Sequence, residues 1–161
     1  MSDGRSDGGG ALRAPPRGAL LRESLGGLEL PRLLLAYPAL ARLPSGDGRP
    51  ILVLPGYGAS DASTLVLRRF LSRLGYDAKG WGLGRNGGDV PELIPKVVER
   101  VEREAEAAGR AVVLVGWSLG GYLAREAARD RPTAVERVVT LGSPVVGGPK
   151  YTAVADRYRA Q

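Results

Sequence analysis

A buried strand that runs directly into a tight turn and a helix constrains this chain more than any other feature. Residues 111–115 (Ala-Val-Val-Leu-Val) are continuously apolar and mostly β-branched, which is typical of a buried strand. Residues 122–129 predict a helix, and the pentapeptide Gly-Trp-Ser-Leu-Gly at 116–120 lies just before it. This arrangement holds a serine on a sharp strand-to-helix turn with its hydroxyl pointing out of the sheet. Ser118 is therefore the candidate nucleophile.

The meaning of this pentapeptide depends on its surroundings, because so short a pattern also arises by chance. The alternatives for Ser118 are a simple turn serine and a helix N-cap. The strand before it and the helix after it favour the nucleophile position. A strand and a helix that meet at such a turn pass close to each other, so the flanking residues must be small. Gly116 and Gly120 meet that requirement, and we expect Gly121 to add slack.

Strands and helices are expected to alternate along the chain from Pro50. The expected strands are residues 50–54, 76–81, 111–115 and 135–141, and the expected helices are 61–73, 89–108 and 122–129. Ser60 or Asp61 can cap the first of these helices. Continuously apolar strands are typical of a parallel sheet that is covered on both faces. With right-handed crossovers, the alternation predicts an α/β fold with helices on both faces of a parallel sheet.

The helix before the central strand has the clearest expected boundaries. Asp89 followed by Glu92 is typical of a capping box, and Gly109 is expected to end the helix. Pro95 predicts that the first turn is short or irregular. The buried stripe is expected to consist of Ile94, Val97, Val98, Val101, Ala105 and Ala108.

The chain divides into three parts by composition. Residues 1–18 are rich in Gly, Ser, Pro and Arg, which predicts a disordered N-terminal tail. Residues 19–49 are leucine-rich but interrupted by Pro31 and Pro38, which predicts an amphipathic helical segment followed by a linker. Residues 50–161 carry the alternating strands and helices and are expected to form a partial α/β domain.

Four segments carry a resemblance to a known family. They are residues 51–57 (Ile-Leu-Val-Leu-Pro-Gly-Tyr), 80–86 (Gly-Trp-Gly-Leu-Gly-Arg-Asn), 116–121 (Gly-Trp-Ser-Leu-Gly-Gly) and 140–144 (Thr-Leu-Gly-Ser-Pro). In order and spacing they resemble the α/β-hydrolases, in particular bacterial lipases and esterases. The resemblance runs from about Pro50 to Pro144. It implies an α/β-hydrolase fold whose C-terminal strands are missing.

The resemblance also implies a reaction, the hydrolysis of carboxylic esters through an acyl-serine at Ser118, with lipid esters among the candidate substrates. In this fold the oxyanion hole combines the backbone N–H after the nucleophile with one from the loop after the first core strand. These donors correspond to Leu119 and, by resemblance to the lipase loop, Tyr57. Gly56 lets the backbone turn toward the substrate. No metal and no organic cofactor are implied.

One departure from the family is serious, because the chain contains no histidine. The family order is Ser, then Asp or Glu, then His, so no Ser-His-Asp triad can be assembled from this chain. Asp130 and Asp156 follow Ser118, but neither is a good candidate for the triad acid. We favour a C-terminally truncated product, ahead of a natural pseudo-enzyme and ahead of Lys or Asp as the base. A non-catalytic binding or scaffold protein is the rival from another functional class.

Residues 82–87 form a literal Gly-x-Gly-x-x-Gly after a strand. A dinucleotide site also needs a helix that begins at the loop and an acidic residue closing the next strand. Here the cap is expected at Asp89 and the next strand ends in Gly116, so a loop flanking a lipase-like cleft is the better interpretation. Nucleotide binding stays a minor alternative. Ser143 is expected either beside the same cleft or in a simple turn.

Composition limits the partners. The net charge is +6, but the basic residues are mostly scattered arginines that alternate with Glu, as at 99–104, which is typical of a solvated surface. We therefore expect a small-molecule ester or lipid substrate, and no nucleic acid. No stretch approaches the roughly 20 apolar residues of a membrane span, and residues 1–10 do not form a secretory signal. With no cysteine in the chain, a cytoplasmic location is the expectation, and no oligomeric state is predicted.

Overall fold

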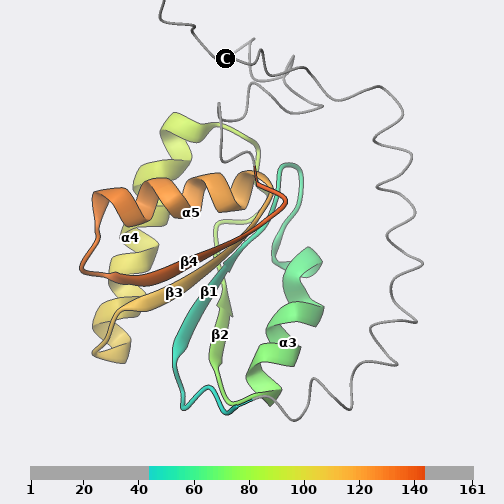
Figure 1. Ribbon diagram of the computed structural model, residues 1–161. Helices are drawn as coiled ribbons and strands as arrows, with labels where there is room; N and C mark the ends of the chain where they lie inside the picture. The colour runs from blue at the N-terminus through green and yellow to red at the C-terminus, as the bar shows by residue number, and fades with distance from the viewer. Residues whose placement is uncertain (1–43, 144–161) are drawn as a thin grey trace, which may run out of the picture.

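The computed structural model describes residues 44–143, and these form a four-stranded sheet with helices on either side (Figure 1). The strands are β1 (Pro50–Leu54), β2 (Asp77–Gly80), β3 (Val112–Trp117) and β4 (Val135–Leu141). The helices are the short 3-10 helix η2 (Asp61–Thr64), α3 (Leu65–Arg73), α4 (Val90–Ala108) and α5 (Leu119–Asp130). The expected N-terminal tail, the leucine-rich segment up to residue 43 and the chain from Pro144 lie outside the described residues.

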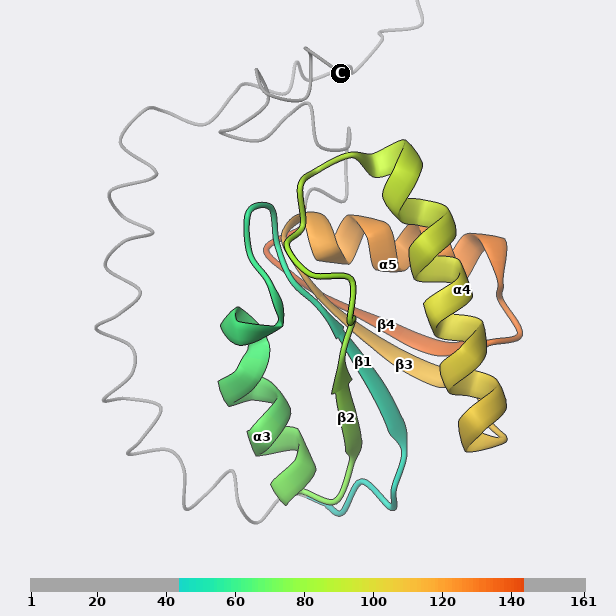
Figure 2. The same cartoon turned by 180° about the vertical axis from the view of Figure 1, so that it is seen from behind.

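Alternate residues of the apolar strands supply two separate cores. In β1, Leu52 and Leu54 belong to the larger core beneath α4 and α5. Ile51 and Val53 belong to the smaller core, against which Leu67 and other partly buried residues pack. Seen from the front and from behind, α3 lies on one side of the sheet and the pair α4 and α5 on the other (Figures 1 and 2). The predicted α/β architecture with helices on both faces is confirmed.

The order of the strands places a topological switch point between β1 and β3. The order is β2-β1-β3-β4 and each neighbouring pair is parallel. The strand β2 thus pairs with one side of β1, and after α4 the chain adds β3 on the other side of β1 and then β4 beyond it. The carboxyl ends of β1 and β3 lie side by side, since Leu54 pairs with Gly116. This is a topological switch point, where open α/β sheets bind their ligands.

Both predicted ends of α4 are confirmed, while the predictions for its interior hold only in part. Asp89 is the N-cap, and its carboxylate accepts a hydrogen bond from the Glu92 N–H (3.2 Å), while Gly109 ends the helix at φ 63°. Pro95, however, lies inside a continuous helix, so the predicted irregular first turn is wrong. The expected buried stripe is confirmed in part: Val97, Val98 and Val101 are buried, and the partly buried Ile94 and Ala105 pack against the core. Leu93 and Glu104 are also buried, whereas Ala108 is exposed.

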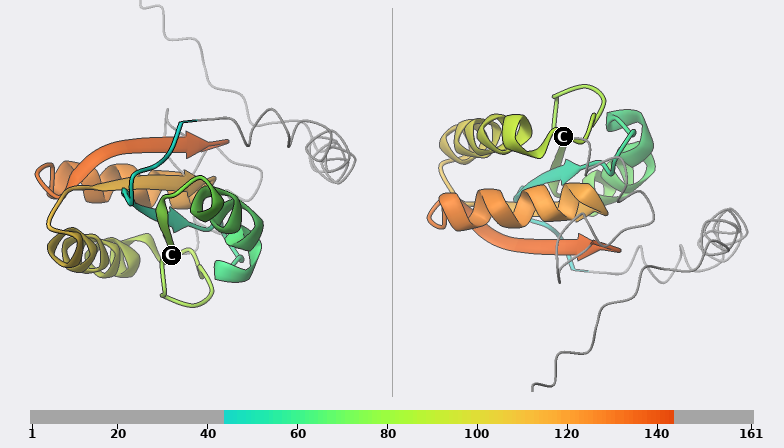
Figure 3. Two further views of the ribbon diagram at one scale, coloured as in Figure 1. Left: turned by 90° about the horizontal axis from the view of Figure 1, so that it is seen from below. Right: turned by 90° about the horizontal axis from the view of Figure 1, so that it is seen from above.

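Other predicted boundaries shift by a few residues. The second strand is shorter than 76–81, the central strand continues as far as Trp117, and the helix after it begins at Leu119. Neither Ser60 nor Asp61 caps a helix through its side chain. Figure 3 shows β4 as an outer strand with β3 as its neighbour. Among residues 44–143, no helix has the length and apolar character needed to cross a membrane.

Candidate active site

Ser118 stands between the last residue of β3 and the first residue of α5, in a conformation that L-residues rarely adopt. Its backbone has φ 51° and ψ −119°. The Ser118 N–H donates to the Leu141 carbonyl (2.8 Å), and its own carbonyl accepts from the Gly121 N–H (3.0 Å). Its side chain makes no capping hydrogen bond to the helix. The N-cap alternative therefore does not explain this serine, and a strained backbone held from both sides is typical of a functional position.

Glycines make this turn possible by letting backbone approach backbone. A Cβ on Gly116 would lie 2.5 Å from the Gly120 carbonyl carbon, and one on Gly120 would lie 2.6 Å from the Pro55 carbonyl oxygen. The prediction that these two positions must be small is thus explained by direct contact. Gly121 was expected only to add slack, and that is wrong. It is buried, and a Cβ there would lie 2.9 Å from both the Gly116 carbonyl oxygen and the Ser143 Cβ.

The loop after β1 lies directly against the nucleophile turn. A Cβ on Gly56 would be 3.4 Å from the Ser118 Cβ and 3.4 Å from the Trp117 carbonyl oxygen. Tyr57, the next residue, is partly buried. Leu119 opens α5, and the first N–H groups of a helix have no partner within it. The two loops expected to form an oxyanion hole therefore meet at Ser118, while the roles of the Tyr57 and Leu119 N–H groups stay predictions.

The glycine-rich loop between β2 and α4 lies beside the loop after β1. Gly58 donates its N–H to the Asn86 carbonyl (2.8 Å), which connects the two loops. The helix α4 does not begin within the Gly-x-Gly-x-x-Gly stretch, and the Asp89 carboxylate occupies its N-terminus. An anionic side chain there opposes the binding of a phosphate, which disfavours the nucleotide alternative.

A cavity of about 320 Å³ lies between this loop and the start of α4. Its lining includes Leu83, Arg85, Glu92 and Lys96, whereas Ser118 does not border it. This cavity is therefore separate from the candidate active site.

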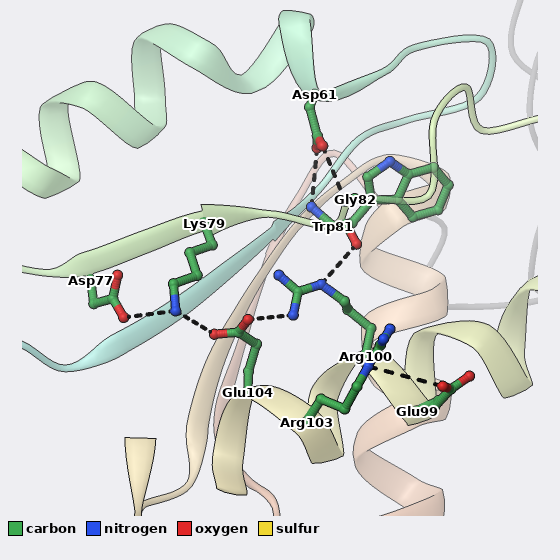
Figure 4. A network of polar contacts seen from close by, with 9 residues as sticks. All are labelled: Asp61, Asp77, Lys79, Trp81, Gly82, Glu99, Arg100, Arg103 and Glu104. Carbon is green, nitrogen blue, oxygen red and sulfur yellow. Dashed lines mark hydrogen bonds and ion pairs between the residues drawn. The ribbon is translucent and has the colours of Figure 1, made fainter. Parts of the chain in front are cut away.

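A network of charged groups holds the start of this loop (Figure 4). The Asp61 carboxylate accepts from the backbone N–H groups of Trp81 (3.0 Å) and Gly82 (3.1 Å). Arg100 Nε donates to the Trp81 carbonyl (3.1 Å) and its guanidinium also pairs with Glu104. Asp61, expected as a helix cap, thus holds the end of β2 instead. A Cβ on Gly80 would meet its carboxylate, so this position also needs a glycine.

Lys79 and Lys96 are poor candidates for a base, because both are held in ion pairs. Lys79 Nζ lies 2.8 Å from a Glu104 carboxylate oxygen and 3.1 Å from one of Asp77. Hydrogen bonds to these two carboxylates raise the pKa of Lys79 above its usual value, whereas a general base needs a lowered one. Lys96 pairs with Glu92.

The carboxylates of the described residues are also poorly suited to act as the base. Burial alone would raise the pKa of Glu104, but hydrogen bonds from Lys79 and Arg100 hold it below its usual value. Asp130 ends α5 and pairs with Arg131 at 3.2 Å. At 1.5 Å per residue, it lies roughly 18 Å along the helix from Ser118. Asp156 and Lys150, the remaining candidates, lie outside the described residues.

Esterases and a lipase are among the proteins to which this chain is similar. The chain is 42% identical over 72 residues to the pimeloyl-acyl-carrier-protein methyl ester esterase of Edwardsiella ictaluri. This match covers 45% of this chain and 25% of the esterase. The esterase of the same name from Shewanella oneidensis is 30% identical over 102 residues, covering 61% and 36%. The crystal structure of the mature Bacillus licheniformis lipase BlEst2 superposes with a TM-score of 0.53 and 25% identity, over 64% of this chain and 44% of the lipase. The chain has the α/β-hydrolase fold and is similar in sequence to esterases of that superfamily.

The chain spans only part of the length of these relatives. Its matches cover about a quarter and about a third of the two esterases. No family model matches it. Within the described residues, the α/β-hydrolase elements present are the first core strand with its loop, the nucleophile turn, and the glycine-rich loop beside them. Sequence reasoning identified all three, but it missed Asn86, whose only signal was a lone asparagine among glycines.

Proposed function

We propose that this α/β-hydrolase chain carries the nucleophile and the oxyanion hole of a carboxylic ester hydrolase. One observation carries the proposal: at the switch point of the sheet, Ser118 adopts φ 51° without capping its helix, and Gly56 of the loop after β1 lies against it. A serine held in this way presents its hydroxyl to a ligand bound outside the sheet. The esterase and lipase relatives support the same class of reaction.

In the proposed reaction, the Ser118 Oγ attacks the ester carbonyl carbon and loses its proton to a base. The carbonyl oxygen becomes an oxyanion, which accepts hydrogen bonds from the backbone N–H groups of Tyr57 and Leu119. The C–O bond to the alcohol then breaks, the alcohol leaves with a proton, and the acyl group remains on Ser118. Attack by water on this acyl-serine releases the carboxylic acid and restores the serine.

The base is not an imidazole of this chain, since these 161 residues include no histidine. A serine hydrolase site without its triad still accelerates acyl transfer by about 10³–10⁴-fold over water, through the oxyanion hole and substrate binding. Because Ser118 has no histidine base in this chain, we expect the 161 residues alone to show little or no ester turnover. The oxyanion hole would still stabilise the charge that develops when Ser118 adds to a reactive probe, so slow labelling of Ser118 is expected.

The proposed substrates are carboxylic esters, lipid esters among them. Two relatives are named for a methyl ester of an acyl group on a carrier protein, and a structural neighbour is a lipase. In each case the scissile group is an ester of a carboxylic acid. Exposed apolar side chains lie near Ser118, since Trp117 is 51% exposed and Leu141 is 45% exposed, and both suit an acyl chain better than a charged substrate.

A fluorophosphonate probe tests this function. The probe forms a P–O bond to an activated serine with loss of fluoride, and intact mass followed by peptide mapping counts and locates the adducts. We expect one adduct at Ser118 in the wild type and none in Ser118→Ala. Ser63→Ala is the matched control, because Ser63 is an exposed serine on η2 whose hydroxyl donates to the Ser60 carbonyl. Equal labelling of several serines, or none at Ser118, would refute the proposal.

A second function is favoured by the missing histidine, namely that of a scaffold with a hydrolase fold and no catalysis. It predicts that Ser118 reacts no faster than the exposed Ser63. The same labelling experiment therefore separates the two functions.

A further inference from the structure

Asn86 is a polar residue in a fully buried position. Its exposed fraction is 0%, and the other buried polar or charged residues in the described part of the chain are Thr64 and Glu104. Burying an amide costs free energy unless its donors and acceptor are satisfied. The partners of Asn86 therefore indicate what it does.

Apart from one hydrogen bond within its own loop, the hydrogen bonds of Asn86 go to the loop after β1. Its backbone N–H donates to the Ala59 carbonyl (2.8 Å), and its backbone carbonyl accepts from the Gly58 N–H (2.8 Å). Its side-chain Nδ2 donates to the Pro55 carbonyl (2.9 Å). Its Oδ1 accepts from the Gly88 N–H (3.1 Å), which fixes the amide orientation within its own loop. Asn86 thus holds the loop after β1 at points before and after Tyr57.

The loop after β1 needs such support because of its own sequence. Tyr57 stands between two glycines, and Gly58 has φ 72°. Glycine leaves the backbone free to rotate, so the direction of the Tyr57 N–H is weakly determined by the loop itself. The Pro55 carbonyl, by contrast, is enclosed between the Asn86 amide on one side and Gly120 on the other, where a Cβ would lie 2.6 Å away. Fixing Pro55 and Gly58 leaves little freedom for the peptide that joins Gly56 to Tyr57.

The loop that carries Asn86 is itself firmly anchored. Asp61 and Arg100 hold the backbone of Trp81, at the end of β2, through its N–H and its carbonyl (Figure 4). The Trp81 indole is fully buried and donates to the Gly84 carbonyl (3.0 Å). Asn86 therefore belongs to a loop whose start is fixed by hydrogen bonds, and a residue that orients a functional group needs such a fixed position.

We propose that Asn86 is a positioning residue, whose side-chain amide holds the loop at residues 55–59 in the conformation that directs the Tyr57 N–H toward Ser118. The catalytic meaning of this conformation rests on the proposed ester hydrolase function. The conformational role itself does not, because it can be measured without turnover.

Amide hydrogen exchange measured by NMR tests the conformational role. Asn86→Asp keeps the size of the side chain and the acceptor for the Gly88 N–H, but it loses the donor to the Pro55 carbonyl. We expect the Gly58 N–H to exchange about tenfold faster or more, while the amides of Val113 and Val115 in β3 keep their protection. Arg85→Ala is the matched control, since it changes an exposed side chain of the same loop and should leave exchange unaltered.

Asn86→Ser provides a milder change in case the aspartate variant does not fold. Its hydroxyl is too short to reach the Pro55 carbonyl, so the same local increase in exchange is expected. If Gly58 exchanges at the wild-type rate in a folded Asn86 variant, the proposal is wrong. If all amides of Asn86→Ser speed up together, Asn86 is a general stabilising residue and the proposal is again wrong.

Fluorophosphonate labelling distinguishes failure of this inference from failure of the proposed function. An unlabelled wild type refutes the ester hydrolase function, whatever exchange shows. A labelled wild type whose folded Asn86→Ser variant reacts at the same rate refutes the positioning role. We expect Ser118 to be labelled about tenfold more slowly in this variant, because an oxyanion-hole donor is worth about 10²–10³-fold in rate and a misdirected one loses part of that.

Discussion

Replacing Gly120 by alanine sets two physical effects against each other within α5. Helix propensity favours the change by at most about 1 kcal/mol, the value for a helix interior, since Gly120 lies in the first turn of α5. Packing opposes it. The new Cβ would lie 2.6 Å from the Pro55 carbonyl oxygen, well inside the 3.4 Å at which ordinary contact begins. The atoms that the new Cβ would meet belong to the backbone of Leu54 and Pro55, so the clash cannot be relieved by rotating a side chain. Overpacking of this kind costs about 3 kcal/mol at the upper end of its usual range, which leaves a net loss of about 2 kcal/mol.

Equilibrium urea unfolding followed by tryptophan fluorescence measures this loss, since the Trp81 side chain is fully buried and reports on the core. With a slope of about 2 kcal/mol per molar urea, the midpoint of Gly120→Ala should fall by about 1 M. Gly87→Ala is the control, because its Cβ would meet no atom within 4 Å and the substitution should leave stability equal or slightly higher. If Gly120→Ala is as stable as the wild type or more so, the close approach of α5 to the loop after β1 is wrong.

Three further predictions concern other parts of the fold. Ser118→Gly should be about 1 kcal/mol more stable than Ser118→Ala in thermal unfolding, because φ 51° strains alanine but not glycine; equal stabilities would argue against the strain. The folded-state pKa of Glu104 lies below its unfolded value of about 4.5, so ionised Glu104 stabilises the fold above that pH, and this stabilisation is lost as the pH falls through the folded value. The urea midpoints at about pH 6 and about pH 3 should therefore differ less in Glu104→Gln than in the wild type. An equal difference in the two proteins would contradict this prediction. Leu141 is 45% exposed on the outer strand β4, so Leu141→Lys should reduce aggregation in light scattering, and an unchanged signal would count against edge pairing.

The strands and the nucleophile turn could be predicted because their signals are local. β1 begins and ends at the expected residues, since a continuous apolar run bounded by turn residues has few other structures open to it. β4 also has the expected bounds, although its sequence mixes valines with Glu136 and Arg137. The same holds for the turn at Ser118, where glycine spacing reports a close approach of backbone segments. Gly121 was misjudged because its neighbour Ser143 is distant in sequence, and no local pattern reveals such a contact.

The errors share a physical cause, which is that tertiary partners outweighed local preference. Asp61 has the sequence position of a helix cap, yet two backbone N–H groups at the end of β2 bind its carboxylate. Pro95 removes one helical hydrogen bond, but it lies on the exposed side of α4. Burial of Val97 and Val98 against the sheet keeps that helix continuous, since most helical stability in proteins comes from packing. Asn86 carries no periodic signal at all, so its importance emerges only from its bonds.

The strand order has a consequence for how the site assembles. The strands β1 and β3 are neighbours in the sheet, but α3, β2 and α4 lie between them in the chain. Contacts between residues so far apart in sequence raise the contact order and slow folding, because a long loop must close before any pairing energy is gained. The contact between Gly56 and Ser118 therefore closes a long loop that contains α3, β2 and α4, and the entropy of closing that loop opposes its formation. We expect a kinetic probe at Ser118 to report formation of this long-range contact rather than of the local helices.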